Sequence, residues 1–176
     1  FRLGDCFRLD RIYGMYMGNG MPRGRLHADY GAMSPTSGSV LGEYFHPRHN
    51  ELTQGFTVVT WNLSDTGPDY GGFCCIPGSH KSNYRLPQKI HDAPEEAPCV
   101  VYPTAPAGSV TLFTEALTHG TAAWRGKHER RSLLYKYCVS NTAWKSERVQ
   151  PPTTVDLTPR QEILFRSPAD PHRHFP

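Results

Sequence analysis

Sixteen glycines and sixteen prolines divide this 176-residue sequence into short segments, most of them rich in β-branched and aromatic residues. Segments of this kind, bounded by turn-forming residues, favour strands over helices. The sequence predicts strands at residues 7–17, 24–30, 56–63, 71–76, 99–103, 109–113 and 131–139. Many short strands with no amphipathic helix between them indicate a mainly β fold, either a barrel or a two-sheet roll.

The C-terminal part carries the one clear helix signal. Thr158 stands where an N-cap belongs, Pro159 follows at the first helical position, and Gln161 comes three residues after the cap. This order is typical of a capping box with proline at the start of the helix. We therefore expect a short helix over residues 158–166.

The length of the chain limits its organisation. With 176 residues, of which 38% are hydrophobic, it can build one core but is short for two. We expect a single domain over residues 1–176. Because the chain begins with Phe1 and enters strand-like sequence almost at once, we also expect it to be part of a longer protein.

Charge and hydropathy argue against several classes of partner. The net charge is only +3, and the most basic stretch, RGKHERR, is interrupted by Glu129, so nucleic acid is not an expected partner. No apolar run approaches the roughly 20 residues that span a bilayer, and no signal-peptide pattern precedes the first strand. We expect a soluble, cytoplasmic protein with no membrane association. The sequence does not predict its oligomeric state.

His27 and Asp29 are the first candidate site residues. They stand two apart in the expected strand 24–30, so their side chains would point to the same face and could bind one metal ion together. The pair taken alone is also compatible with an ordinary hydrogen-bonded histidine and carboxylate on the surface.

A second histidine strengthens the metal interpretation. His119 follows an apolar strand, and a polar loop separates it from the next expected strand. Two histidines and one carboxylate on separate strands can form the facial triad that leaves open positions on Fe(II). The absence of cysteine from this set argues against a structural zinc site. The alternative for His119 is a strand-end histidine bonded to backbone.

Four motifs together resemble one enzyme family. They are HAD at 27–29, GGFCCIPGSHKSNY at 71–84, HGT at 119–121 and RRS at 130–132. Their order and spacing resemble the phytanoyl-CoA dioxygenase family of Fe(II)/2-oxoglutarate oxygenases over roughly residues 24–140. The resemblance implies a double-stranded β-helix, which is a cupin-like jelly-roll with a few short peripheral helices. The family also carries helices before the first ligand strand, and this chain is expected to lack them.

The resemblance implies roles for individual residues. His27, Asp29 and His119 become the Fe(II) ligands and thus the catalytic residues. Arg130 stands where the family binds the far carboxylate of 2-oxoglutarate, and an arginine fork suits that carboxylate. Ser132 and Thr121 would add hydroxyl groups near the same co-substrate.

The strand 130–139 leaves one ambiguity. Its odd-numbered face, which begins with Arg131, is more apolar than the face that begins with Arg130, so simple alternation would turn Arg131 toward the core. The spacing from His119 in the family favours Arg130 instead. We expect Arg130 to be the co-substrate residue.

The implied reaction consumes O2 and 2-oxoglutarate, releases succinate and CO2, and hydroxylates a small-molecule substrate. Asp29 is the carboxylate that halogenating relatives lack, so its presence favours hydroxylation, desaturation or ring formation. Neither an acyl-CoA nor a free small molecule is excluded as the substrate, because similarity of fold does not transfer a substrate. The alternative function is that of a non-catalytic or differently metallated cupin-like domain.

Overall fold

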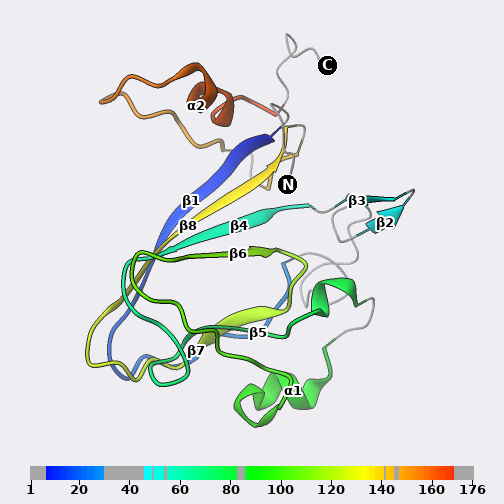
Figure 1. The fold of residues 1–176 in the computed structure, drawn as a ribbon, viewed down its shortest axis with the longest axis vertical. Helices are drawn as coiled ribbons and strands as arrows, with labels where there is room; N and C mark the ends of the chain where they lie inside the picture. Colours follow the sequence, from blue (N-terminus) through cyan, green and yellow to red (C-terminus); the bar gives the residue numbers. More distant parts are fainter. Residues whose placement is uncertain are drawn as a thin grey trace.

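The computed structural model describes residues 7–29, 46–48, 50–53, 55–82, 86–140, 142–144 and 147–168. Its larger sheet contains the strands β1 (Phe7–Met17), β4 (Thr57–Asn62), β6 (Val110–Thr114) and β8 (Arg130–Val139). They are arranged in the order β1-β8-β4-β6, and every neighbouring pair is antiparallel (Figure 1). The chain therefore brings its first and last long strands together at one side of this sheet.

A smaller sheet lies across from the larger one and contains β5 (Gly72–Cys75) and β7 (His119–Ala122) (Figure 1). Two isolated bridges extend it, because His27 pairs with His119 and Val101 pairs with Cys75. Four segments thus run side by side in the order His27, β7, β5 and Val101. The two sheets together form the expected jelly-roll, with mainly β structure.

Short elements surround the roll. The hairpin β2 (His46–Arg48) and β3 (Glu51–Thr53) precedes β4, and the segment after β5 contains η1 (Ser79–Lys81), α1 (Gln88–Asp92) and η2 (Pro94–Glu96). The helix α2 (Pro159–Leu164) begins at Thr158, whose side chain and Gln161 form the capping box that the sequence indicated. No helix in the described segments is long and apolar enough to cross a membrane.

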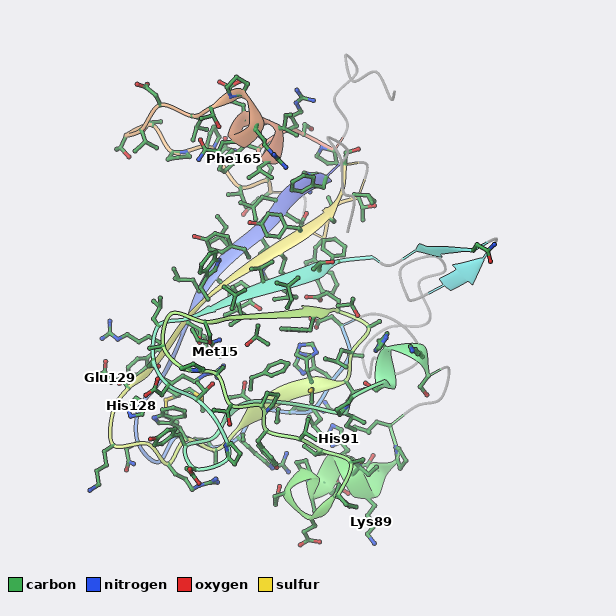
Figure 2. The ribbon with its side chains drawn as sticks, viewed as in Figure 1. Met15, Lys89, His91, His128, Glu129 and Phe165 are labelled. Carbon is green, nitrogen blue, oxygen red and sulfur yellow. The ribbon has the colours of Figure 1, made fainter. Side chains whose placement is uncertain are left out.

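Two of the buried clusters in the described segments lie on opposite faces of the smaller sheet. Between the sheets, Val58, Phe113 and Leu134 are buried together, and Phe73 packs against them. Met15 belongs to this inner packing as well (Figure 2). On the other face of the smaller sheet, a second cluster forms from Leu26, Cys74, Val100 and Ala122 beneath side chains of α1 and its neighbours.

The strand β8 shows which of its faces points inward. Its even-numbered residues are all buried, and Arg130 among them is only 2% exposed. The odd-numbered residues between them are half-buried or exposed. Arg131 is exposed and pairs with Glu129 at 2.6 Å. Simple hydrophobic alternation would therefore give the wrong face, because the more apolar odd-numbered side lies on the outside of the larger sheet. The inner face carries the polar residues instead.

Several expected elements differ from the structure. Of the expected strands 24–30 and 99–103, the described residues contribute only single bridges, at His27 and Val101. Residues 119–122 form β7, although the sequence indicated a polar loop after His119. These four residues have no apolar alternation, and backbone pairing with β5 is what holds them in the sheet.

Candidate metal centre

His27 and His119 meet at one bridge of the smaller sheet. The backbone N–H of each donates to the carbonyl oxygen of the other, and both bonds measure 2.8 Å. Residues paired in this way present their side chains to the same face, and the two imidazole rings lie 4.6 Å apart between centroids. Gly120 permits this close approach, because a Cβ there would lie 2.9 Å from the carbonyl oxygen of Arg25.

Asp29 completes the cluster two residues after His27. Its backbone N–H donates to the carbonyl oxygen of Glu115 at 3.0 Å, which fixes the segment against the chain that follows β6. One carboxylate oxygen, Oδ1, lies 3.6 Å from Nε2 of His27. One ligand atom from each of His27, Asp29 and His119 lies within 4.8 Å of the other two. The structure thus brings together all three residues that the sequence indicated, at distances that one ion could bridge.

Both imidazoles are oriented by backbone. Nδ1 of His27 lies 2.8 Å from the carbonyl oxygen of Arg25, and Nδ1 of His119 lies 2.7 Å from that of Leu117. A carbonyl oxygen can only accept, so each Nδ1 donates to the backbone, and each Nε2 is the ring nitrogen left for a metal ion. Burial lowers the pKa of His119 to about 4, so this ring is neutral at pH 7. The donor set therefore suits a cation.

Asp29 contacts a lysine and a second carboxyl group that the sequence interpretation missed. Lys136 lies 3.1 Å from Oδ2 of Asp29 and 2.6 Å from Oε1 of Glu115. Burial raises the pKa of Glu115 to about 8, and Asp29 adds to that rise against the charge of Lys136. Burial alone would also raise the pKa of Asp29, but contact with Glu115 and the charge of Lys136 outweigh it and hold that pKa below its usual range. At neutral pH Asp29 is ionised.

Arg130 lies on the same inner surface and has no counter-ion among the described residues. Its Nη1 contacts the sulfur atoms of Met15 at 3.0 Å and Met17 at 3.4 Å. Its Nε has no hydrogen-bond partner within the described segments, and no described carboxylate forms an ion pair with it. Burial lowers the pKa of Arg130 to about 10, which still leaves it charged at pH 7. A buried cation without an anion is unfavourable, so the arrangement suits an anionic ligand.

Hydroxyl groups on the inner face also lack partners. Oγ of Ser132 and Oγ1 of Thr60 are buried and make no hydrogen bond to the described part of the chain. Ser132 lies two residues from Arg130 on β8, and Thr60 lies on the adjacent strand β4. Thr121 is half-buried on β7, two residues after His119. The sequence interpretation missed Thr60, although its inward position could have been inferred from the alternation of β4.

The IPGSHK segment has a structural role beside this centre. Ser79 is buried, and its Oγ accepts a hydrogen bond from the backbone N–H of Thr118 at 2.7 Å. The backbone N–H of Ile76 donates to the carbonyl oxygen of Thr118 at 2.9 Å. Gly78 supplies the left-handed conformation, with φ of 82°, that starts the turn. These contacts hold the residue that directly precedes His119.

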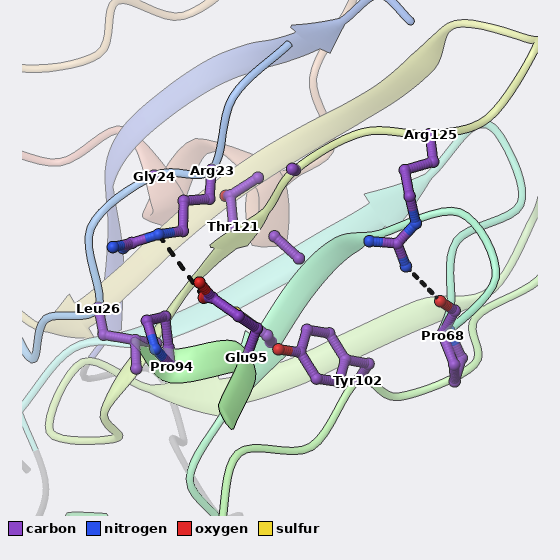
Figure 3. Close-up of a pocket in the computed structure, with 12 residues that line it drawn as sticks. Arg23, Gly24, Leu26, Pro68, Pro94, Glu95, Tyr102, Thr121 and Arg125 are labelled. Carbon is purple, nitrogen blue, oxygen red and sulfur yellow. Dashed lines mark hydrogen bonds and ion pairs between the residues drawn. The ribbon is translucent and has the colours of Figure 1, made fainter. Parts of the chain in front are cut away.

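A separate cavity of about 430 Å³ lies on the other face of the smaller sheet (Figure 3). Cys74, Ala122 and Thr121 are among the residues that line it, whereas none of the three clustered residues does. Arg23 at its wall lies 3.8 Å from Glu95, and Arg125 donates to the carbonyl oxygen of Pro68 at 2.7 Å. The charged groups of this cavity thus already have oxygen partners from the protein, whereas the described contacts of Arg130 are to methionine sulfur.

Comparisons with known proteins support one family and one fold. The phytanoyl-CoA dioxygenase (PhyH) family matches residues 16–132. Among solved structures, HygX from Streptomyces hygroscopicus with nickel and 2-oxoglutarate bound is 24% identical, with a TM-score of 0.64 over 76% of this chain and 58% of HygX. EctD from S. alaskensis in its apoform is 20% identical, with a TM-score of 0.56 over 96% of this chain and 55% of EctD.

AviO1 from Streptomyces viridochromogenes Tue57 is 18% identical, with a TM-score of 0.53 over 83% of this chain and 54% of AviO1. The chain therefore spans less than two thirds of these structural relatives, and at such identities they establish the fold alone. No curated protein matches the sequence significantly. The match over residues 16–132 covers most of the chain and confirms the resemblance seen in its motifs, so the chain belongs to the phytanoyl-CoA dioxygenase family, whose cofactors are Fe(II) and 2-oxoglutarate.

Proposed function

We propose that this protein is an Fe(II)/2-oxoglutarate-dependent dioxygenase that hydroxylates a small molecule. One observation carries the proposal. A cluster of two histidines and one carboxylate shares the inside of the roll with Arg130, a buried arginine that no described carboxylate neutralises. The first group suits a metal ion and the second suits a carboxylate of the co-substrate.

The donor set fits Fe(II). His27 and His119 each offer Nε2 while Nδ1 donates to backbone, and Asp29 offers Oδ1. Imidazole and carboxylate in a two-to-one ratio favour Fe(II) with open positions, and none of the three is a cysteine. The bound ion would supply the place where 2-oxoglutarate and O2 react to oxidise the substrate.

The inner face also fits 2-oxoglutarate. Arg130 would bind the far carboxylate through its planar fork, and the fork retains its charge despite burial. Ser132, Thr60 and Thr121 would provide hydroxyl groups along the same ligand. The first two have buried oxygen atoms without a described partner, which a bound carboxylate would satisfy.

Aromatic side chains would protect the centre from water. The ring of Phe113 lies 4.6 Å from that of His119, and the ring of Phe73 stacks on the same imidazole at 6.2 Å. The two phenyl rings also contact each other at 4.8 Å. This apolar wall would limit the access of water to the reacting atoms.

For the overall reaction, we infer that the substrate C–H bond becomes C–OH, while 2-oxoglutarate and O2 are converted to succinate and CO2. The second atom of O2 enters succinate, so the reaction needs no further reductant. One structural relative, HygX, has been solved with nickel, 2-oxoglutarate and hygromycin B bound. We accordingly propose a free small molecule as substrate, although an acyl-CoA remains the alternative to be tested. Asp29 favours hydroxylation, or a related desaturation or ring closure.

An anaerobic titration tests the proposal. Purified apoprotein is mixed with Fe(II) and then with 2-oxoglutarate, and the weak visible charge-transfer band of their chelate is followed. We expect the band in the wild type and its loss in His119→Ala. His91→Ala is the matched control, because His91 lies on α1 outside the cluster (Figure 2).

The absence of the band in folded wild-type protein would contradict the proposal. It would favour the alternative function, that of a non-catalytic or differently metallated cupin-like domain. A band without succinate formation under O2, across a panel of small molecules and acyl-CoAs, would keep cofactor binding but overturn the proposed catalysis for those substrate classes.

A further inference from the structure

Lys136 is a buried cation next to the candidate metal centre. Its side chain is only 5% exposed, and its Nζ lies between Asp29 and Glu115 at 3.1 and 2.6 Å. The ring of Tyr13 lies 5.9 Å from Nζ and that of Trp144 lies 5.6 Å from it. Four different side chains therefore surround this single ammonium group.

Stability alone does not explain this arrangement. A buried ion pair can often be replaced by apolar residues of similar volume without loss of stability, because desolvation offsets the attraction between the charges. A lysine is also not required to hold a metal ion, since its ammonium repels cations. The position of Lys136 beside Asp29 therefore points to an effect on that carboxylate.

The two oxygen atoms of Asp29 lie in different surroundings. Oδ1 lies 3.6 Å from Nε2 of His27, at the cluster. Oδ2 points to Lys136 and receives a charge-assisted hydrogen bond of 3.1 Å from it. A free carboxylate can bind a cation through one oxygen or through both. In this protein one of the two oxygens is already engaged.

We propose that Lys136 is a positioning residue that holds Oδ2 of Asp29, so that Asp29 presents Oδ1 alone to the metal. This inference rests on the proposed function. Binding through a single oxygen is important for the proposed function, because a second oxygen from Asp29 would occupy a coordination position that 2-oxoglutarate needs. Lys136 would thereby leave that coordination position free for the co-substrate.

Glu115 holds Lys136 in place from the other side. Its side chain is 1% exposed, and its backbone is fixed by hydrogen bonds to the backbone of Asp29 and Phe56 at 3.0 and 3.1 Å. The carboxyl group of Glu115 is thus a fixed point, to which Lys136 is held at 2.6 Å. The rings of Tyr13 and Trp144 flank the ammonium and limit its movement toward water.

The test replaces Glu115 and Lys136 in one double variant. In Glu115→Leu/Lys136→Met the two buried polar groups become apolar at similar volume, so neither stays buried without the other, and the bound metal ion remains as the counter-ion of Asp29. The matched control is Glu129→Leu/Arg131→Met, which removes an exposed ion pair from the same strand region. Two quantities are measured: the number of water molecules on bound Mn(II), from water-proton relaxivity, and the Kd of 2-oxoglutarate for the Fe(II)-loaded protein.

We expect the buried-pair variant to retain metal binding but to hold roughly one water molecule fewer, because both oxygens of Asp29 become available. The Kd of 2-oxoglutarate should rise by about tenfold or more, a usual loss when the partner of a metal ligand is removed. The exposed-pair variant should match the wild type in both quantities. An unchanged water number and Kd in the buried-pair variant would overturn the inference.

A measurement on the wild type keeps the inference testable if the variant does not fold. The infrared carboxylate bands of 13C-aspartate-labelled protein are compared with and without Zn(II), because the separation of the symmetric and asymmetric bands distinguishes one-oxygen from two-oxygen binding. A two-oxygen pattern in the wild type would overturn the inference but leave the proposed function intact. Failure of the wild type to bind any of these metals would instead contradict the proposed function itself.

Discussion

His27 and His119 are joined by two reciprocal backbone hydrogen bonds of 2.8 Å each, so the spacing of their imidazoles depends on how closely two segments of the smaller sheet approach. Main-chain pairing thus brings together two residues that are distant in sequence and that we propose as metal ligands. Gly120 lies at the point of closest approach. A side chain there would disturb the site without removing any ligand.

Gly120→Ala should therefore weaken metal binding. The new Cβ would lie 2.9 Å from the carbonyl oxygen of Arg25, the same oxygen that accepts from Nδ1 of His27. We expect a loss of about 1–3 kcal/mol in the free energy of unfolding, as is usual for overpacking, together with a lower Mn(II) affinity. Urea denaturation and metal titration measure the two effects. Gly14→Ala is the control, since its Cβ would meet only an ordinary contact at 4.0 Å.

The sequence predicted the larger sheet better than the smaller one. Residues 7–17 formed the expected strand, a run of 11 residues with three aromatic side chains and no proline. Residues 119–122 did not look like a strand, since only pairing with β5 holds them extended. The three clustered residues could be predicted because their spacing matches known motifs. The close contact of His27 with His119, however, depends on tertiary pairing that no local pattern encodes.

Lys136 and Glu115 were missed for a different reason. Lys136 stands at an inward position between Leu134 and Cys138, and a lysine among buried neighbours was the available signal. Glu115 follows β6 and gives no local pattern of its own. The role of the two residues can be recognised only when the fold brings β8 and the end of β6 together beside Asp29.

Arg130→Lys should weaken 2-oxoglutarate binding while leaving metal binding unchanged. The lysine keeps the charge but loses the planar fork that can bind both carboxylate oxygens, so we expect Kd to rise about tenfold or more. Isothermal titration of the Mn(II)-loaded protein with 2-oxoglutarate measures the effect. Arg131→Lys is the matched control, because Arg131 is exposed and pairs with Glu129. A defect in the control alone would reverse the assignment of the two arginines.

Ser132→Ala should give a smaller defect in the same measurement. Its Oγ is buried and has no partner among the residues that the structure describes, so the hydroxyl is available to the co-substrate. Loss of one hydrogen bond of this kind corresponds to about 0.5–1.5 kcal/mol, or a rise in Kd of roughly twofold to thirteenfold. Thr60→Val tests the neighbouring hydroxyl in the same way. Unchanged binding in both variants would place the co-substrate elsewhere.

The contribution of His119 to the stability of the metal-free protein should fall as the pH is lowered from 7 to 4, opposite in sign to that of Glu115, whose raised pKa of about 8 favours the folded state over the same range. His119 has an ordinary pKa of 6.5, which burial lowers to about 4 in the folded state. The unfolded chain therefore takes up a proton at this residue before the folded chain does, and its contribution to stability is present above pH 6.5 and is lost as the pH falls toward 4. Denaturation across this range, with a chelator present, measures the loss. His119→Gln should reduce the slope, and an unchanged slope would show that other groups cause it.

Ser79→Ala should affect both stability and the metal centre. Its buried Oγ accepts a 2.7 Å hydrogen bond from the backbone N–H of Thr118, directly before His119. Alanine would leave that N–H unpaired, which costs about 1–3 kcal/mol in a buried position, and His119 would lose one of its positional constraints. Urea denaturation should therefore detect a loss of stability, and Mn(II) titration a weaker affinity.

Ser64→Ala provides the comparison, because Oγ of Ser64 accepts the same kind of bond, from the backbone N–H of Arg131 at 2.8 Å, in an exposed place. Water can replace that bond, so its loss should change stability little and metal binding not at all. Equal losses of stability in the two serine variants would show that burial does not set the strength of the Ser79 bond. An unchanged Mn(II) affinity in Ser79→Ala would show that His119 is positioned by its bridge to His27 without help from the segment that follows β5.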